Sequence, residues 1–525
     1  MPCQWKLRVS QTQEPNFDLN SWSEALNISP FLARLLWQRG ISSLHELDVF
    51  LSPGLRHLSP LKNWPDVKHA AQILSRELSQ NKTLAVWGDY DVDGVTATAL
   101  VIDFLRQKGF SPLSFLPHRL EDGYGLNLQA LEQLRNQGVD ILLTVDCGIS
   151  EQEVVQRARE LGMTVIITDH HLPGENLPQA QCIVNPRLKD CPNQDLAGVG
   201  VAFLLMAALN RLLPGDALDI RQFLDLVALG TIADVVNLKG ENRVLVKNGL
   251  LLLSEARRPG IFALKEASDL PPTAKLGTGQ VGFSLAPRLN AAGRVDSPEI
   301  ALELLLAPDL ESARPLAQKL RKLNKERQKT EEKILEQALK QAQTQEQNPG
   351  LVLYDPSWHP GVIGIVASRV AEEFCRPCLL LTQDQEGLQG SGRSIAEFDL
   401  YSGLNSCSDI LTGFGGHRQA AGLRLKEHNL EQLKTLFAAA VNEQLPQGLP
   451  QPCRHVDAQL GFKQIDLTLV KELELLQPFG PGNPQPVFYS RKLTVNKHKI
   501  FGKKHVSLEV KENEGGISLL GKAWR

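Results

Sequence analysis

The sequence lacks the features of a secreted or membrane-bound protein. Its eight cysteines are scattered over 525 residues, which does not indicate a disulfide framework. The one CxxC pair, Cys375 and Cys378, has no second pair beside it that would complete a zinc or redox site. No apolar stretch is long enough to span a bilayer, and the first residues lack the apolar core of a signal peptide. We therefore expect a cytoplasmic protein that does not associate with a membrane.

The chain also lacks an excess of charge and several common catalytic motifs. Its 56 basic and 59 acidic residues give a net charge of −3, so it is not a generally basic nucleic-acid-binding protein. It has no GxxxxGK[ST] phosphate-binding loop, no HExxH helix and no GxSxG turn. One segment without acids is strongly basic, and it is either a track for a phosphate backbone or a solvated hairpin. Its cations are Arg491, Lys492, Lys497, Lys499, Lys503 and Lys504.

From residue 83 onward, short apolar runs alternate with helical segments. The expected strands cover 84–89, 113–117, 141–146 and 163–169, and the expected helices cover 94–108, 127–136 and 150–161. This alternation predicts an α/β fold with a doubly wound parallel sheet. Helical segments follow at 197–213 and 218–236, then a long charged helix from 298 to 344 and a second α/β unit from 351 to 445. The first 75 residues predict short helices broken by prolines, and the last 70 or so predict strands.

Acidic residues and histidines gather where the predicted strands end. Asp89, Asp91 and Asp93 follow the first strand, Asp146 the third and Asp169-His170-His171 the fourth, while Asp234 closes the helical segment at 218–236. Parallel strands end at one edge of a sheet, where ligands bind in open α/β folds, so these side chains should meet in space. Carboxylates spaced so closely repel one another unless a cation holds them together. The pattern therefore predicts a metal site with oxygen and nitrogen ligands.

Two other carboxylate sites fit the sequence less well. An EF-hand loop beginning at Asp89 would need a glutamate at its twelfth position, which is Leu100, and would follow a helix instead of a strand. A phosphatase with an aspartate nucleophile would need a later lysine and an acidic pair, where this chain has Asp169-His170-His171. The histidines favour metal ligation.

The ligand types also narrow the metal and the reaction. Carboxylates mixed with imidazoles suit Mn²⁺ or Mg²⁺. The five or six candidate ligands exceed what one ion needs, so we expect two ions that share a carboxylate. Two such ions promote in-line displacement at phosphorus, which predicts hydrolysis of a phosphoester or phosphoanhydride.

Several strings of residues resemble a known superfamily. Asp89-Tyr90-Asp91-Val92-Asp93-Gly94, Asp146-Cys147-Gly148 and Asp169-His170-His171, together with Asp234, are similar to the motifs of the DHH phosphoesterases. Longer strings at 282–294, 358–369, 390–394, 415–422 and 477–484 resemble the RecJ family within that superfamily, the single-strand-specific 5′→3′ exonucleases of bacterial recombination and repair. The resemblance extends over residues 75 to 510.

The resemblance implies a domain order. It predicts an N-terminal helical segment (1–75), a DHH domain (76–297), a linker helix (298–348), a DHH-associated α/β domain (349–447) and an OB-like domain for single strands (448–525). The chain stops soon after Ser518, so we expect an abbreviated or truncated barrel. Phe479, Tyr489 and Phe501 are its candidate base-stacking residues, and the alternative for each is a place in the core.

The resemblance also implies roles for the acids and histidines. Asp91, Asp93, Asp146, His170 and Asp234 would bind two Mn²⁺ or Mg²⁺ ions, with the catalytic Asp146 as the bridge. His171 would contact the scissile phosphate as a catalytic residue. Asp89 is either a further ligand or an acid behind the ligands, because simpler relatives have a histidine where this chain has Trp87.

Further residues would bind the substrate. Arg288, Asn290 and Arg294, expected in a glycine-containing turn, would hold the strand, and Arg369, Ser391, Arg393 and His417 would bind phosphates near its 5′ end. Arginine makes bidentate phosphate contacts, and glycine beside His417 lets backbone N–H groups approach an anion.

These roles combine into one expected activity. We expect a monomeric, metal-dependent exonuclease that releases 5′-mononucleotides from single-stranded DNA and has a helicase and a single-strand-binding protein as partners. The alternatives are a DHH oligoribonuclease or other small phosphoester hydrolase, and an inactive replication scaffold.

Overall fold

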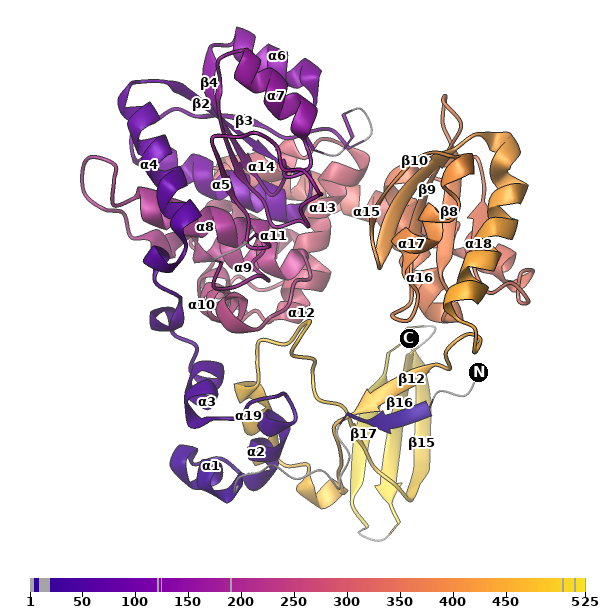
Figure 1. Ribbon diagram of the computed structural model, residues 1–525. Helices are drawn as coiled ribbons and strands as arrows, with labels where there is room; N and C mark the ends of the chain where they lie inside the picture. Colours follow the sequence, from indigo (N-terminus) through magenta and orange to yellow (C-terminus); the bar gives the residue numbers. More distant parts are fainter. Residues whose placement is uncertain are drawn as a thin grey trace. The chain divides into compact units, whose positions relative to one another are not determined.

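The computed structural model describes residues 4–8, 19–119, 122–123, 125–188, 191–502, 505–513 and 516–524 (Figure 1). The chain forms two compact units. Unit 1 contains Met1–Leu58, Asn237–Asn248 and Pro452–Arg525, and unit 2 contains Ser59–Val236 and Gly249–Gln451. None of the helices among the described residues is both long and apolar enough to cross a membrane.

A parallel sheet of five strands lies at the centre of the first half of unit 2. Its strands are β2 (Thr83–Gly88), β3 (Leu113–Phe115), β4 (Val139–Val145), β5 (Thr164–Thr168) and β6 (Cys182–Val184), in the spatial order β3-β2-β4-β5-β6. The helices are α4 (Pro65–Ser79), α5 (Val92–Gln107), α6 (Leu128–Asn136), α7 (Gln152–Glu160) and α8 (Gly198–Leu209). Helices α6 and α7 pack on one face, and α4, α5 and α8 on the other. The predicted doubly wound sheet is therefore confirmed, with β6 as an unpredicted edge strand.

Helices fill the remainder of this half. They are α9 (Leu224–Ala233), the part of α10 (Gly240–Glu255) from Gly249 onward, α11 (Pro259–Ala267), α12 (Thr278–Gln280), the π-helical η4 (Val281–Leu285), α13 (Ala286–Val295), α14 (Glu299–Leu306) and α15 (Leu310–Gln343). The predicted single helix from 298 to 344 is wrong, because Ala307 leaves the helical conformation and Asp309 caps a new helix by accepting from Ser312 N at 2.9 Å. Arg288, Asn290 and Arg294 lie on α13 and not in the predicted turn.

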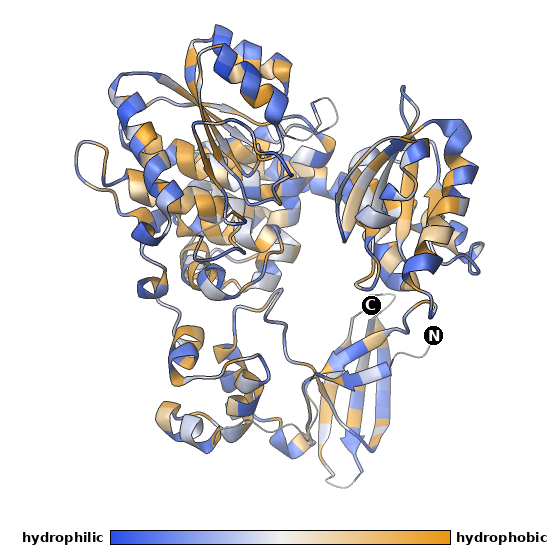
Figure 2. Ribbon diagram, viewed as in Figure 1, coloured by the Kyte–Doolittle hydropathy of each residue, from blue (hydrophilic) through white to orange (hydrophobic). Residues whose placement is uncertain are grey.

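The second half of unit 2 is a mixed sheet between helices. Strands β7 (Leu351–Tyr354), β8 (Cys378–Gln383), β9 (Leu388–Arg393), β10 (Leu411–His417) and β11 (Ala420–Leu425) follow the order β10-β11-β9-β8-β7, in which only β7 and β8 are parallel neighbours. Helix α16 (Pro360–Phe374) and the end of α15 pack on one face, and α17 (Leu400–Asn405) and α18 (Leu430–Gln444) pack on the other. Hydrophobic residues concentrate on the strands between these layers (Figure 2).

Unit 1 combines short helices with strands from both ends of the chain. Its elements are β1 (Gln4–Leu7), α1 (Leu19–Leu26), α2 (Pro30–Trp37), α3 (Leu44–Leu51), β12 (Cys453–Val456), β13 (Ala458–Gln459), α19 (Leu467–Leu475), β14 (Phe488–Tyr489), β15 (Leu493–Phe501), β16 (His505–Glu512) and β17 (Ser518–Ala523). Strands β15, β16 and β17 form an antiparallel sheet, so the β-rich end is confirmed. Phe479 packs against the core of α1, α2 and Leu476, whereas Tyr489 lies edge-on to Trp5, 6.3 Å between ring centres. Of the basic segment, Lys503 and Lys504 lie outside the described residues.

Candidate metal centre

The predicted metal residues meet at one edge of the parallel sheet. The sheet order places β2 beside both β3 and β4, so the chain changes direction at β2, and ligands bind at such switch points in open α/β folds. The loops after β2, β4 and β5 lie there with the end of α9. Three groups of side chains each bring their ligand atoms within 4.8 Å of one another. They are Asp89, Asp91 and Asp146; Asp93, His170 and Asp234; and Asp146, His170 and His171.

Backbone amides hold the first two acids in place. Asp91 is the N-cap of α5, and its Oδ1 accepts from Asp93 N at 2.9 Å and Gly94 N at 3.1 Å. Asp93 accepts from the first amides of α8, with Oδ2 at 2.7 Å from Gly198 N and Oδ1 at 2.9 Å from Val199 N. Helix N-termini offer unpaired backbone amides to carboxylates, so these bonds fix both side chains in place.

Asp146 occupies the centre of the site under backbone strain. Its φ is 63°, in the left-handed region that non-glycine residues seldom adopt, and its side chain is almost fully buried. Its Oδ1 lies 3.1 Å from His170 Nε2, although these two atoms do not meet hydrogen-bond geometry. Among the described residues, Asp146 Oδ1, Asp234 Oδ2 and His170 Nε2 are buried and have no hydrogen-bond partner. Buried polar atoms that lack partners and face one another are suited to coordinate a cation.

Burial and crowding change the charge of these groups in the absence of a cation. Burial, then the charge of Asp91, raises the pKa of Asp93 to about 7. Burial, then Asp93, raises the pKa of Asp234 to about 9, and burial raises the pKa of Asp146 well above its usual range. Burial, with the neighbouring His171, lowers the pKa of His170 to about 3, so its imidazole is neutral and free to ligate. Oxygen and neutral imidazole donors in this number fit Mn²⁺ or Mg²⁺.

Asp169 orients His171. Its Oδ1 accepts from His170 N at 2.7 Å and His171 N at 3.0 Å, and lies 2.7 Å from His171 Nδ1, while its Oδ2 accepts from Ile149 N at 3.0 Å. Burial alone would raise the pKa of Asp169, but the hydrogen bond and charge of His171 outweigh it and lower the pKa. Burial alone would lower the pKa of His171, but the hydrogen bond and the charge of Asp169 outweigh burial and raise this pKa. An ionised Asp169 thus fixes the imidazole with Nδ1–H as donor.

Asp89 and Trp87, at the end of β2, lie in different surroundings. Asp89 is buried, and its Oδ1 has no hydrogen-bond partner among the described residues. Burial and Asp91 raise the pKa of Asp89, and its carboxylate belongs to the group with Asp91 and Asp146. Trp87 instead fills the core under α6 and α7, with its ring centre 4.2 Å from that of Phe115. Trp87 is therefore a packing residue.

A group of cations lies near the acids. Burial, then repulsion from Arg119, Arg327 and Arg393, lowers the pKa of Arg294 to about 10. Arg294 on α13 donates to Gly361 O at 3.2 Å, and the Arg119 guanidinium lies 4.9 Å from the ring centre of Tyr90, between Asp89 and Asp91 in the chain. Guanidinium groups that depress one another's pKa form a site for a polyanion.

The other predicted substrate residues are divided between this group and other contacts. Ser391 accepts from Arg393 Nη1 at 3.0 Å on β9, and the pKa of His417 is lowered by burial and then by Arg393 and His171. Arg369 lies on α16 and pairs with Glu331 at 3.1 Å. Arg288 donates to Ser284 O within the same helical segment, and Asn290 is half-buried on α13.

Sequence reasoning missed three parts of this region. Asp169 is the carboxylate that orients His171, and its place in the Asp-His-His string could have shown this. Arg119 follows β3 and could have been found by applying the strand-end rule to cations as well as acids. Arg327 lies on the exposed-looking charged helix α15, and nothing in the local pattern distinguishes it.

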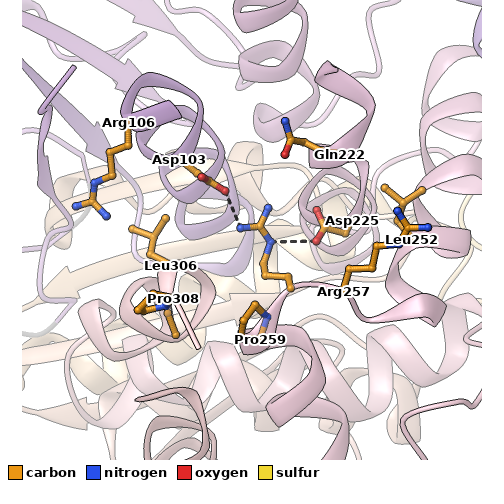
Figure 3. Close-up of a pocket in the computed structure, with 11 residues that line it drawn as sticks. Asp103, Arg106, Gln222, Asp225, Leu252, Arg257, Pro259, Leu306 and Pro308 are labelled. Carbon is orange, nitrogen blue, oxygen red and sulfur yellow. Dashed lines mark hydrogen bonds and ion pairs between the residues drawn. The ribbon is translucent and has the colours of Figure 1, made fainter. Parts of the chain in front are cut away.

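A cavity of about 530 Å³ lies elsewhere in unit 2 (Figure 3). It is lined by Arg106, Arg257 and Arg258 with apolar residues such as Leu306 and Pro308. Two carboxylates neutralise the central Arg258: Asp103 at 2.8 Å and Asp225 at 3.0 Å. None of the predicted site residues lines this cavity.

Comparisons with known proteins agree with this architecture. Family models match as the DHH family N-terminal domain (residues 83–231), the DHHA1 domain (347–443) and the RecJ OB domain (456–525). The single-stranded-DNA-specific exonuclease RecJ of Salmonella typhimurium (strain LT2) is 38% identical over 521 residues, 95% of this chain and 89% of the relative.

Solved structures give the same result. RecJ from Thermus thermophilus in complex with Mn²⁺ superposes with a TM-score of 0.84 at 33% identity, covering 99% of this chain and 74% of that one. Its complex with Mg²⁺ gives a TM-score of 0.77 at 32% identity, covering 100% and 73%. The chain therefore belongs to the RecJ family of single-stranded-DNA-specific exonucleases.

Proposed function

We propose that this chain is a metal-dependent exonuclease that degrades single-stranded DNA from its 5′ end to 5′-mononucleotides, in DNA repair and recombination in the cytoplasm. Family membership supports the substrate class, since the relatives are named for this activity. The cluster of buried acids and His170 at the sheet edge is the observation that carries the hydrolytic chemistry. As the resemblance implies, we also propose a monomer with a helicase and a single-strand-binding protein as partners.

Two divalent ions, Mn²⁺ or Mg²⁺, would be held in this cluster. Asp89, Asp91 and Asp146 would hold one, and Asp93, His170 and Asp234 the other, because each set lies within 4.8 Å. Asp146 would be shared between them, as the resemblance implies, and it belongs to two of the three groups. When bound, such ions supply Lewis acidity and lower the pKa of water. Solved RecJ relatives contain Mn²⁺ or Mg²⁺, which supports this metal choice.

His171 would contact the scissile phosphate. Its Nδ1 lies 2.7 Å from Asp169 Oδ1, and this contact fixes the orientation of the ring. The raised pKa of His171 favours the imidazolium, which donates to a phosphate oxygen. Asp169 fixes the ring while Asp146 and the other acids bind the metals.

The cations would bind the strand. Ser391, Arg393 and His417 would bind phosphates near the 5′ end, because Arg393 donates to Ser391 and its charge lowers the pKa of His417. Arg294, whose pKa is lowered by burial and then by cations that include Arg393, would hold the strand. Arg288 and Asn290 would hold the backbone further along α13. Arg369 is paired with Glu331, so its proposed role in phosphate binding is supported by the sequence pattern alone.

Labelled substrates test this function. The protein is incubated with Mn²⁺ or EDTA and with 5′- or 3′-labelled single strands, duplex DNA or short RNA. We expect Mn²⁺-dependent release of 5′-labelled mononucleotide from single-stranded DNA, and loss of that activity in Asp146→Ala. Asp140→Ala, which removes a half-exposed carboxylate paired with Arg135, is the control and should remain active.

Three results would contradict the proposal. Activity in EDTA, or in Asp146→Ala, would exclude the metal mechanism. A preference for di- to pentaribonucleotides would favour the oligoribonuclease alternative. Release of the 3′ label first would exclude the 5′→3′ polarity.

A further inference from the structure

Phe283 is an aromatic residue placed where a core residue would normally lie. Its side chain is 88% exposed, whereas Val281 and Leu285, two residues to either side, are fully buried. The segment Val281–Leu285 is a π-helix, a rare conformation that often occurs at functional sites. The π-helical turn therefore anchors itself with its neighbours and presents Phe283 to solvent.

This segment lies against the helix that carries Asp234. A Cβ at Gly282 would lie 3.8 Å from Ile232 Cγ2, two residues before Asp234. Val235, directly after Asp234, is 65% exposed and has a φ of 63°, which a branched side chain rarely adopts. Strain of this kind concentrates at functional sites. Two exposed apolar side chains thus belong to the segments next to one acid of the metal centre.

The helix that follows the π-helical turn carries a guanidinium group. Arg288 lies on the helix that continues from the π-helical turn and donates to Ser284 O. Its Nε is buried and has no hydrogen-bond partner among the described residues, and burial and then Arg321 lower its pKa. Arg288 thus reaches back to Ser284, the chain neighbour of Phe283. An exposed ring and a guanidinium group on one continuous helical segment match single-stranded nucleic acid, in which bases and phosphates alternate.

We propose that Phe283 stacks on a nucleobase of the single strand near the metal centre while Arg288 binds an adjacent phosphate. The inference rests on the proposed function and deepens it by naming a base-binding position. Every base presents a flat face, so such a stack binds single strands without reading their sequence. A paired base is already stacked on its neighbours, so the same contact favours single strands over duplexes.

The test compares strands with and without bases. Kinetics are measured on a 5′-phosphorylated single strand and on one of equal length in which abasic residues replace the bases near the 5′ end. For Phe283→Ala we expect KM on the normal strand to rise about tenfold, with kcat within about twofold, because one base–aromatic stack is lost. On the abasic strand the wild type and Phe283→Ala should have equal KM values.

Two further variants separate stacking from other roles. Phe283→Tyr keeps the ring and should retain the wild-type KM, whereas Phe283→Leu should resemble Phe283→Ala. Leu251→Ala removes another strongly exposed apolar side chain of unit 2 and should change nothing. Circular dichroism and thermal unfolding show whether each variant is folded.

Several outcomes would overturn the inference. These are an unchanged KM in Phe283→Ala, an equal loss on the abasic strand, and full activity in Phe283→Leu, which would indicate a contact with protein. Strand affinity is also measured in an Asp146→Ala background, where Phe283→Ala should raise Kd about tenfold. That binding readout separates failure of the stack from failure of the proposed exonuclease function.

Discussion

At the scale of single residues, the site depends on the absence of a Cβ at Gly198. Gly198 N binds Asp93 at 2.7 Å, and a Cβ there would lie 2.6 Å from Asp146 Oδ1. The glycine therefore lets α8 approach two metal-centre acids at once. Glycine is needed here for its small size and not for its backbone conformation, because its φ lies outside the left-handed region.

Gly198→Ala should inactivate the enzyme without unfolding it. The new methyl group must displace Asp146, and a misplacement of about 1 Å can lower turnover about 100-fold. The measurement is kcat on single-stranded DNA at saturating Mn²⁺, with circular dichroism to verify the fold. Gly279→Ala is the control, since its Cβ would meet nothing within 4 Å. Activity within a few-fold of the wild type in Gly198→Ala would be inconsistent with this close packing.

Asp234 makes the metal-free protein sensitive to pH. Its pKa in the folded state is about 9, whereas the pKa of an unfolded aspartate is about 3.9. A pKa raised by folding contributes stability that is complete below the unfolded pKa and is lost as pH rises through the folded pKa. In EDTA, the free energy of unfolding should therefore fall between pH 6 and pH 8, because folded Asp234 keeps a proton in this range that the unfolded chain releases.

Asp234→Asn should weaken that pH dependence, because asparagine does not titrate in this range. Urea unfolding in EDTA at pH 6, 7 and 8 measures the slope for both proteins. Asp48→Asn, at an exposed carboxylate of unit 1, should keep the wild-type slope. Equal slopes for wild type and Asp234→Asn would show that Asp234 is already ionised at neutral pH.

At the scale of elements, Arg376 closes the end of α15. Its Nη1 donates to three carbonyl oxygens that follow the helix, those of Gln345 (3.4 Å), Glu346 (2.8 Å) and Asn348 (2.7 Å). Carbonyls at a helix end lack partners within the helix, so one guanidinium satisfies the groups that follow it. The side chain is 8% exposed.

Arg376→Met should destabilise this part of unit 2 by about 3 kcal/mol, because three carbonyl oxygens lose a charged donor whose side chain is buried. The change in the midpoint of urea unfolding, followed by circular dichroism, measures the effect. Arg424→Met is the matched control in the same sheet region, since its exposed pairs with Asp384 and Glu386 contribute about 1 kcal/mol or less. An equal shift of the midpoint in both variants would show that Arg376 contributes no more to stability than the exposed Arg424.

The elements also show what the sequence could and could not predict. The strands β2, β4 and β5 were predictable because each is a continuous apolar run, and their ends located the acids through the geometry of parallel sheets. Strand β6 has three residues, too few to show a period. The break between α14 and α15 was missed although Pro308 and the N-cap Asp309, which follow Ala307, are signals for the start of a new helix.

The sequence predicted the acids of the site but not the tertiary contacts that hold them. Its acids follow strands, so the sequence pattern locates them. The hydrogen bonds that fix Asp93, however, come from α8, and Gly198 lies 105 residues later in the chain. Arg119 and Arg327 join the cationic group only through tertiary packing. Phe283 lies within an otherwise apolar string, and its exposure became visible only when the π-helical turn was seen.

At the scale of the whole molecule, the metal centre belongs to unit 2 alone. All seven side chains of its three groups lie between Asp89 and Asp234. A ligand that binds only the folded state stabilises by an amount set by its concentration over Kd, about 2.7 kcal/mol at 100 times Kd. Metal binding should therefore stabilise one of the two units.

Calorimetry should resolve this difference. We expect two unfolding transitions, of which Mn²⁺ raises the temperature of one and leaves the other within experimental error of its value in EDTA. Asp146→Ala should remove the Mn²⁺ response and keep both transitions. An equal Mn²⁺ shift of both transitions would show that the two units unfold together.

The pairing of β1 with β12 has a consequence for synthesis of the chain. The register joins Gln4 to Cys453, so one partner is made long before the other. Synthesis adds about 5–20 residues per second, so β1 waits about 20–90 seconds for its partner. Throughout that time its edge is open to chaperones and to the same strand of neighbouring nascent chains. Unit 1 can therefore complete this strand pair only after Cys453 has been made, whatever its own folding rate.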